Sequence, residues 1–314
     1  ELYDIDHNPT TISGFANIHV SMTCTPAIAD IDNDGIEEIV VATRSDLNGA
    51  SHKLCVYKNR DADNDGVPDL AWERPIDYKN FNGVTLSDLD DDGFLEIIVP
   101  NQGNNGQYGY TYLEIFDCFG NYYYPKNTIA VINTNNHDRK AVTMAVVADF
   151  DNDGHKEIAF GLEGGVYLWR CGSQTLSTLV PCQGRMDCPI IAADIDNDEN
   201  LEILYMVIKD KKGYIYAIKS DASTVSGWDD DSHFIPIKGD DLGWEWPPYF
   251  SVGDIDNDGS IEVFIADKGR LKMWGSDGAP FGLGEINIPD LDCRYFQPVI
   301  ADVDGNGDCE IIIP

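Results

Sequence analysis

The chain has 314 residues, of which 43% are hydrophobic, so it can bury a sizeable core and is not an acidic disordered chain. Lysine and arginine number 21 against 55 aspartates and glutamates, which gives a formal net charge of -34. This excess of negative charge argues against nucleic acid and anionic membrane surfaces as partners, and it is typical of a protein that gathers divalent cations.

The cellular context is predicted from what the chain lacks and from its cysteines. No apolar run approaches the roughly 18 residues of a membrane span, so we expect no membrane insertion. The chain starts at Glu1 without Met or signal peptide, and we interpret it as a mature fragment of a larger secreted or cell-surface protein. Its eight cysteines hint at an oxidising, extracellular compartment. Cys171 and Cys182 flank a predicted hairpin and are the one pair for which we expect a disulfide; the other pairings stay open.

The first acidic segment follows two strand-like runs at residues 1–5 and 11–20 and a short strand at 25–29. It covers residues 30–38 (DIDNDGIEE), with acidic side chains at positions 1, 3, 5 and 9 and Gly35 at position 6. Oxygens at alternate positions of a tight turn converge on one point, and glycine permits the backbone conformation of such a turn. Carboxylates held this close repel one another without a cation, and hard oxygen ligands suit Ca²⁺. A single copy is equally compatible with a solvated acidic turn.

The recurrence of this segment decides between the two interpretations. After strands at 39–42 and 53–58, a related segment at 61–69 joins two outer strands. The main pattern then returns five times, with its first aspartates at 88, 149, 194, 254 and 302. The separations, counted from Asp30, are 58, 61, 45, 60 and 48 residues, the size of one four-stranded propeller blade.

The segments between the acidic copies predict the outer strands of each blade. They read as a strand, a polar turn and another strand, at 112–120 and 121–132, 165–171 and 176–180, 213–220 and 226–237, and 270–275 and 281–288. No helix-period stretch appears, so we expect an all-β protein. The last copy stops after its second strand, at 311–313, and the chain opens on two strands. We therefore predict one propeller domain over 1–314, with six blades closed by pairing of the N- and C-terminal strands. A truncated propeller of seven or eight blades is the alternative.

The acidic segments resemble the calcium-binding repeats of the FG-GAP/VCBS family of β-propellers, the blade type of the integrin α-subunit head. The resemblance covers nearly the whole chain and implies up to seven Ca²⁺ ions. Positions 1, 3, 5 and 9 would bind calcium through side chains and position 7 through its backbone carbonyl. The implied ligands are Asp30, Asp32, Asp34, Ile36 and Glu38; Asp61, Asp63, Asp65, Val67 and Asp69; Asp88, Asp90, Asp92, Phe94 and Glu96; Asp149, Asp151, Asp153, His155 and Glu157; Asp194, Asp196, Asp198, Asn200 and Glu202; Asp254, Asp256, Asp258, Ser260 and Glu262; and Asp302, Asp304, Asn306, Asp308 and Glu310.

Two copies depart from the pattern, and two other families fit it poorly. Glu199 replaces the position-6 glycine of the fourth copy, and Asn306 replaces the position-5 aspartate of the sixth. Both changes are expected to weaken their sites. An EF-hand needs a glutamate at position 12 and flanking helices, whereas position 12 of the first copy is Val41 and the flanks are predicted strands. The Gly-His and Trp-Asp signature of WD-type propellers is absent.

Ligand binding is expected on the face opposite the acidic loops, because loops on a rigid scaffold usually carry recognition. Aromatic, amide and basic side chains there suit a protein or glycan ligand, although packing and turn formation also explain them. The candidates are Asn105, Tyr108, Arg139, Trp244 and Tyr295.

No catalytic constellation is visible, so we predict that the chain is not an enzyme. The preferred hypothesis is a calcium-stabilised binding or adhesion module for a protein or glycan, whose partners include other modules of the same precursor. The alternatives are a polysaccharide-degrading enzyme resembling propeller-type pectin lyases, and a structural spacer in a surface assembly.

Overall fold

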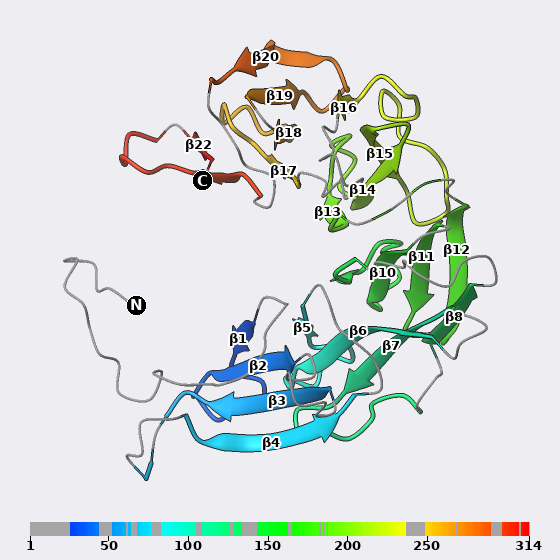
Figure 1. Cartoon of the computed structure of the whole chain (residues 1–314), viewed down its shortest axis with the longest axis vertical. Coiled ribbons are helices and arrows are strands. Elements are labelled where there is room, and N and C mark those ends of the chain that lie inside the picture. The colour runs from blue at the N-terminus through cyan, green and yellow to red at the C-terminus, as the bar shows by residue number, and fades with distance from the viewer. Residues whose placement is uncertain are drawn as a thin grey trace. The chain divides into compact units, whose positions relative to one another are not determined.

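The chain is all-β in the part that the structure, a computed structural model, describes (Figure 1). That part comprises residues 26–43, 52–60, 62–63, 68–76, 83–104, 109–125, 129–133, 143–162, 165–181, 184, 186, 188–236, 249–267, 269–289, 297–307 and 309–313. Within these ranges the secondary structure consists of strands and turns, arranged in antiparallel sheets of two to four strands. Nothing in the described ranges forms a helix long and apolar enough to cross a membrane.

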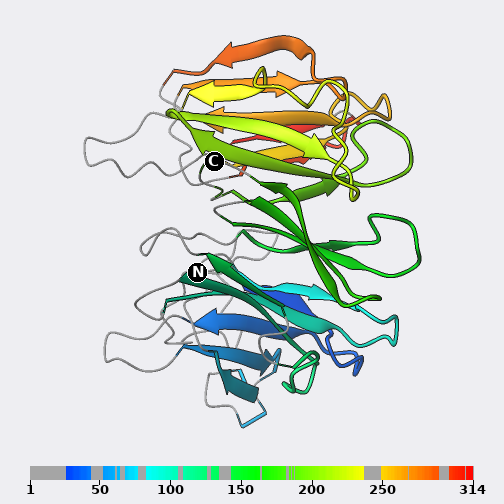
Figure 2. The same ribbon diagram turned by 90° about the vertical axis from the view of Figure 1, so that its right-hand side faces the viewer.

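The strands group into two compact units, residues 1–140 and 141–314, which we describe separately. The first unit holds two four-stranded meanders, in which each strand pairs with the next one along the chain (Figure 2). The first meander consists of β1 (Ala27–Ala29), β2 (Glu38–Thr43), β3 (Lys53–Lys58) and β4 (Leu70–Pro75). The second consists of β5 (Thr85–Ser87), β6 (Glu96–Asn104), β7 (Gly109–Phe116) and β8 (Ile129–Asn133).

The second unit holds three more four-stranded meanders and a two-stranded sheet. The first two meanders are β9 (Val146–Ala148), β10 (Glu157–Leu162), β11 (Gly165–Arg170) and β12 (Thr175–Pro181), and β13 (Ile191–Ala193), β14 (Glu202–Lys209), β15 (Lys212–Ile218) and β16 (Phe234–Pro236). The third is β17 (Phe250–Gly253), β18 (Glu262–Asp267), β19 (Arg270–Trp274) and β20 (Pro280–Asn287). The two-stranded sheet is β21 (Val299–Ala301) and β22 (Glu310–Ile312).

Strand β14 illustrates why the second strands are continuous apolar runs rather than alternating ones. Its side chains point alternately to the two faces of its sheet, and both faces are covered. Ile203, Tyr205 and Val207 pack in one core with residues of β10 and β11. Leu204 and Met206 pack in another core with residues of β18 and β19. The hydrophobic cores of this unit therefore lie between successive sheets, and β18, like β14, contributes to two of them.

The predicted outer strands are confirmed in position, with two differences in length. The segment predicted as a strand over 226–237 forms one only at Phe234–Pro236. Before it lies a run of turns rich in Asp, Ser and Gly, which favour turns over strands. Fully buried Trp228 belongs to this run, and its Nε1 donates to the carbonyl of Ser276 at 2.7 Å. Of the strand predicted over 121–132, the described residues form an isolated bridge at Tyr122 and the start of β8.

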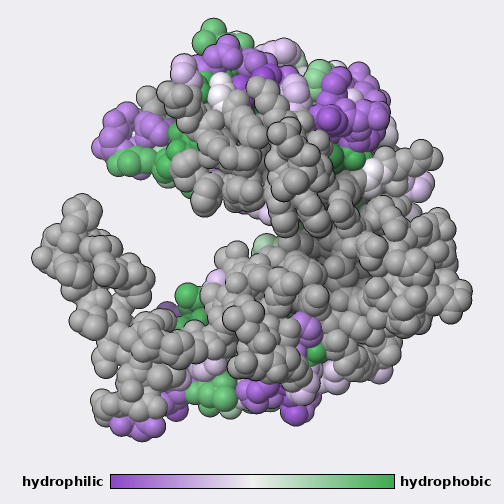
Figure 3. All heavy atoms as spheres, in the orientation of Figure 1, coloured by the Kyte–Doolittle hydropathy of each residue, from purple (hydrophilic) through white to green (hydrophobic). Residues whose placement is uncertain are grey.

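The two-stranded sheet at the C-terminal end contains the second strand of the sixth acidic copy, as predicted. Val299, Val303 and Ile312 are 52%, 64% and 42% exposed on this sheet and its loop. In Figure 3 hydrophobic and hydrophilic residues accordingly lie next to one another at the place of β21 and β22. The strands predicted to pair with this sheet, at 1–5 and 11–20, lie outside the described residues, so closure and blade number remain predictions.

Candidate metal centres

Each acidic copy is the connection between the first and second strands of a sheet. Its position-9 glutamate is the first residue of the second strand, and a small residue just before position 1 pairs with it. In the first meander this pair is Ala29 and Glu38. The equivalent pairs are Ser87 and Glu96, Ala148 and Glu157, Ala193 and Glu202, Gly253 and Glu262, and Ala301 and Glu310. The six loops thus share one register, which aligns them position by position.

The aspartates at positions 1 and 5 shape the turn through its backbone. Asp30 accepts hydrogen bonds from the N–H groups of Asp34 (3.1 Å) and Gly35 (2.8 Å), and Asp34 accepts one from Ile36 (2.9 Å). The same three bonds recur in the second to fifth loops. These aspartates are therefore oriented by their own loop before any ion binds.

Two backbone positions of each loop are left-handed. Position 4 has φ between 55° and 60° in the first five loops, where the residue is Asn or Asp, the non-glycine types that best tolerate this region. Position 6 has φ between 85° and 95° wherever it is glycine. A Cβ added to Gly35, Gly154 or Gly259 would meet no atom within 4 Å, so glycine is needed for its backbone angle and not for space. Glu199 consequently fits the fourth loop with φ 71°, at the cost of strain, and keeps the hydrogen bonds of the turn.

The position-9 glutamate ties the loop to the sheet. Oε2 of Glu38 accepts the backbone N–H of Ile31, at position 2, at 3.0 Å. The five other loops repeat this bond at 2.8–3.0 Å. In the related segment Asp69 plays the same part, because its Oδ1 accepts from Ala62 at 3.2 Å. One glutamate oxygen is thus used for structure, and the other remains for a cation.

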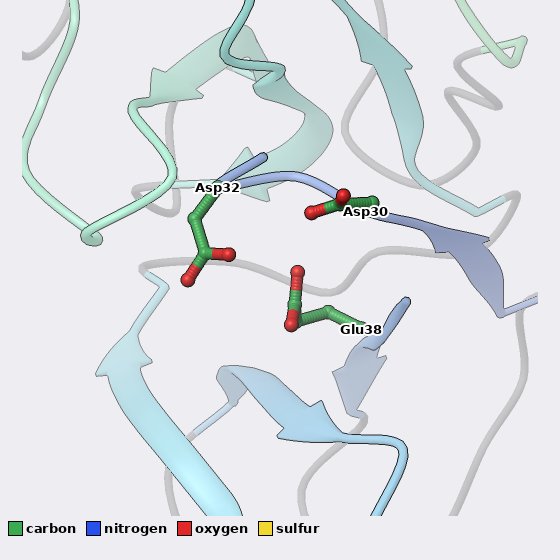
Figure 4. A group of neighbouring side chains, drawn as sticks. All are labelled: Asp30, Asp32 and Glu38. Atoms are coloured by element: carbon green, nitrogen blue, oxygen red, sulfur yellow. The ribbon is translucent and has the colours of Figure 1, made fainter. Parts of the chain in front are cut away.

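The carboxylates of positions 1, 3 and 9 gather at one point in each of the first five loops. One oxygen from each of the three residues lies within 4.8 Å of the others. Figure 4 shows the first loop, in which the side chains of Asp30, Asp32 and Glu38 point toward one another. Calcium binds oxygens at 2.3–2.6 Å, and two ligands on opposite sides of the ion are then about 4.8 Å apart. Oε1 of Glu202, on a fully buried side chain, has no hydrogen-bond donor among the described residues, and Lys219 Nζ lies 3.6 Å from it. Such a set of hard oxygens, of which the glutamate's is buried, fits a calcium ion.

Lysines enter two of these clusters. Lys58 Nζ, at the end of β3, lies 2.7 Å from Asp32, 2.9 Å from Asp34 and 2.8 Å from Glu38. Burial opposes the charge of Lys58, but its hydrogen bonds to these three carboxylates outweigh burial and raise its pKa. Lys219 Nζ likewise pairs with Asp196 (2.9 Å) and with Asp198.

The position-9 glutamates of the second to fifth loops have raised pKa values. Burial, together with the carboxylates of Asp90, Asp92 and Asp88, raises the pKa of Glu96 to about 7, although the hydrogen bond from Leu89 opposes the shift. Burial, together with the neighbouring aspartates, also raises the pKa of Glu157 to about 7. Burial and, to a smaller extent, the neighbouring carboxylates therefore both oppose the charged form of these glutamates.

Successive loops of the second unit are joined by the side chains of position-4 asparagines. Asn152 donates to Asn200 of the next loop, and Asn197 Nδ2 donates to Ser260 Oγ at 3.3 Å. Asn257 Nδ2 donates to the carbonyl of Gly307 at 2.7 Å. The loops from the third to the sixth therefore lie side by side along one edge of this unit.

Some predicted site residues cannot be placed. Asp61, Asp65, Val67, Asp308 and the ligand-binding candidates Asn105, Tyr108, Arg139, Trp244 and Tyr295 lie outside the described residues, as does Cys182 of the predicted disulfide. Asn306 keeps the turn of the sixth loop, since its N–H still reaches Asp302 Oδ1 at 3.1 Å.

Three sets of residues have roles that were not predicted from the sequence. The residue at position 2 is apolar in all six main copies, and Ile31, Phe150 and Ile195 are nearly or fully buried. The repeated apolar letter between two aspartates was a usable signal for this anchor. The asparagine at position 4, present in four of the six main copies, was a second signal. The lysines that enter the loops lie 20 and 17 residues after their glutamates, and only strand pairing reveals them.

Comparisons with known proteins agree with this architecture. A family model described as an FG-GAP-like repeat matches residues 254–313, which contain the fifth and sixth acidic loops, and confirms the resemblance for that segment. No curated protein matches the chain. Among solved structures, the chain is similar to the biofilm matrix protein Bap1 of V. cholerae, with a TM-score of 0.51 and 16% sequence identity. The match covers 85% of this chain and 40% of the Bap1 chain, and at this identity it establishes similarity of fold alone.

The strained turn at Glu199 generates a prediction. Replacing Glu199 by glycine is expected to stabilise the protein by about 1 kcal/mol, because glycine adopts a left-handed conformation without steric strain. The melting temperature should rise by about 2–4 °C for a unit of this size. Glu199→Gln, which removes the charge and keeps the Cβ, is the matched control and should produce less than half of that shift. Equal shifts in the two variants would contradict backbone strain as the cause.

The raised pKa values generate a second prediction. Glu96 and Glu157 titrate near pH 7 in the folded protein and near 4.5 in the unfolded chain, so the folded state binds more protons between these values. Metal-free protein should therefore lose stability as pH rises from about 5 to about 7.5. Denaturant unfolding in a chelator measures this slope, and the Glu96→Gln, Glu157→Gln double variant should flatten it. An unchanged slope in that variant would show that Glu96 and Glu157 do not cause the loss of stability.

Proposed function

We propose that the chain is a calcium-stabilised extracellular module that acts in surface adhesion or binding and has no catalytic activity. The observation that carries the calcium part is the recurrence, in five loops, of an aspartate, a second aspartate and a glutamate whose oxygens lie within 4.8 Å. Carboxylates repel one another, and here hydrogen bonds from the backbone of the loop hold the position-1 aspartate and the position-9 glutamate close together.

Calcium would be held by the side chains of positions 1, 3, 5 and 9 and by the carbonyl of position 7, at up to seven loops. Its charge would offset the burial and the repulsion by neighbouring aspartates that together raise the pKa of Glu96 and Glu157. In extracellular modules such sites bind with Kd of about 10⁻⁴–10⁻³ M, and tenfold excess over Kd stabilises by about 1.4 kcal/mol per site. Several sites together would rival the whole stability of an ordinary domain.

The FG-GAP-like repeat and the fold similarity to a biofilm matrix protein support the adhesion part of the proposal. We propose a protein or glycan as the ligand, bound through the loops at the strand ends away from the acidic edge. Asn105, Tyr108, Arg139, Trp244 and Tyr295 are the candidate contacts. Other modules of a longer precursor are proposed as further partners.

Chelation tests the calcium part. Adding EDTA is expected to lower the melting temperature by several degrees, because the carboxylates of the loops then repel one another without a cation. Differential scanning fluorimetry with 1–5 mM calcium restored afterwards measures the reversal, and magnesium serves as the control ion. Identical melting curves with and without EDTA would remove calcium from the proposal.

The adhesion part predicts saturable, calcium-dependent binding to a glycan or surface protein on an array. Binding should fall at least tenfold in EDTA under conditions where the protein stays folded, since the loops need a rigid scaffold. The same protein should release no unsaturated product from acidic polysaccharides. Measurable turnover would favour the pectin-lyase-like alternative instead.

A further inference from the structure

One position of each meander faces the acidic loop from the third strand. It is the residue opposite the position-9 glutamate across the pairing of the second and third strands. Lys58 faces Glu38 and Arg170 faces Glu157 in this way. Continuing the register of the other sheets by one residue gives three more facing residues: Asp117 for Glu96, Lys219 for Glu202 and Gly275 for Glu262. The loops are nearly alike, but the residues that face them differ in charge from sheet to sheet.

In the first and fourth loops the facing lysine lies among the expected calcium ligands. Lys58 Nζ is 2.7–2.9 Å from the carboxylates of positions 3, 5 and 9. Lys219 Nζ contacts the carboxylates of positions 3 and 5 and lies 3.6 Å from that of position 9. An ammonium group in contact with these oxygens occupies the space that an ion bound at 2.3–2.6 Å needs. Calcium can enter only if the lysine leaves.

The second and fifth loops have no facing lysine. Gly275 brings no side chain to the fifth loop, and no lysine or arginine of the described residues forms an ion pair with Asp254, Asp256, Asp258 or Glu262. In the second loop the facing residue is Asp117, which adds a negative charge and is itself held by the backbone N–H groups of its own turn.

The third loop is intermediate between these cases. Arg170 reaches Asp151 only at 3.5 Å. Its other nitrogens donate to Ser177 Oγ at 3.0 Å and to the carbonyl of Ser220 at 3.1 Å. The guanidinium is therefore held largely outside the cluster.

We propose that Lys58 and Lys219 are built-in counter-ions that stabilise the first and fourth loops without metal and compete with calcium there. The fifth loop, which faces Gly275 and has no such counter-ion among the described residues, depends on calcium instead. This inference rests on the proposed calcium binding and adds that the loops divide into two classes. As calcium falls, the sheets that carry a facing lysine keep their loops closed, while the lysine-free ones lose their stabilising ion first.

Removing the lysines tests the proposal. Lys58→Met and Lys219→Met together keep the aliphatic bulk and delete both charges. Calcium titrated into the full chain by isothermal titration calorimetry should then bind about tenfold or more tightly at two sites. Lys53→Met with Lys212→Met is the matched control, because these lysines begin the same strands, β3 and β15, and lie away from the loops. The control should bind calcium as the unaltered chain does.

The reciprocal experiment adds a lysine to the fifth loop. A Cβ at Gly275 would meet only Asp277 Oδ1 at 3.5 Å and the carbonyl of Ala279 at 4.0 Å, so a side chain is accommodated. Gly275→Lys should weaken calcium at one site about tenfold or more, whereas Gly275→Met, of similar length, should not. This variant keeps the proposal testable if the lysine deletions unfold the chain.

The outcomes separate the two proposals. Tighter binding on lysine removal and weaker binding in Gly275→Lys support the division of the loops. If the unaltered chain binds calcium and both sets of variants match their controls, the lysine proposal is overturned and calcium binding stands. If neither the unaltered chain nor the lysine-deletion variant binds calcium, the proposed function fails as well.

Discussion

The hydrogen bond from the position-2 N–H to the position-9 glutamate is the contact on which the rest of each loop depends. It joins the start of the loop to the first residue of the next strand, and it recurs in all six main copies at 2.8–3.0 Å. Because the side chain at position 2 is apolar and faces the core in most copies, the bond also fixes the loop against the sheet. The glutamate is buried as a result, and its remaining oxygen is left beside the aspartates of positions 1 and 3. This hydrogen bond therefore holds a buried carboxylate beside two others, and a bound cation would relieve the repulsion between them.

The loops differ in which positive charges lie beside their carboxylates. A lysine ammonium lies in the first and fourth clusters, whereas no lysine faces the second and third, where the pKa of the glutamate rises to about 7. The pKa of Glu202 in the fourth cluster is also raised, mainly by burial. Taking carboxylates out of water beside other carboxylates is costly unless a positive charge is present. Loops that look alike in the sequence thus differ in the charges that surround them. In our proposals, calcium supplies the charge that the chain itself does not provide.

Neighbouring sheets of the second unit share hydrophobic cores, and neighbouring loops share hydrogen bonds. Strand β14 divides its side chains between two cores, and the neighbouring sheets supply the other half of each core. The asparagine contacts between loops follow the same succession from sheet to sheet in the second unit. The acidic edge of this unit is therefore joined from loop to loop by side-chain hydrogen bonds.

The sequence by itself determined the strand content, the division into meanders and the acidic loops, because these follow from local patterns: alternate carboxylates, a glycine that permits a left-handed turn, and short apolar runs. It also placed the short final sheet, through the last acidic copy.

Only the tertiary structure decided that 226–233 forms turns around the buried Trp228, since that side chain is placed by a contact with Ser276 48 residues away. It likewise decided that Lys58 and Lys219 enter two of the loops. Those lysines lie on a different strand from their carboxylates, and the pairing that brings them together depends on strand register, which no local pattern near the loop encodes.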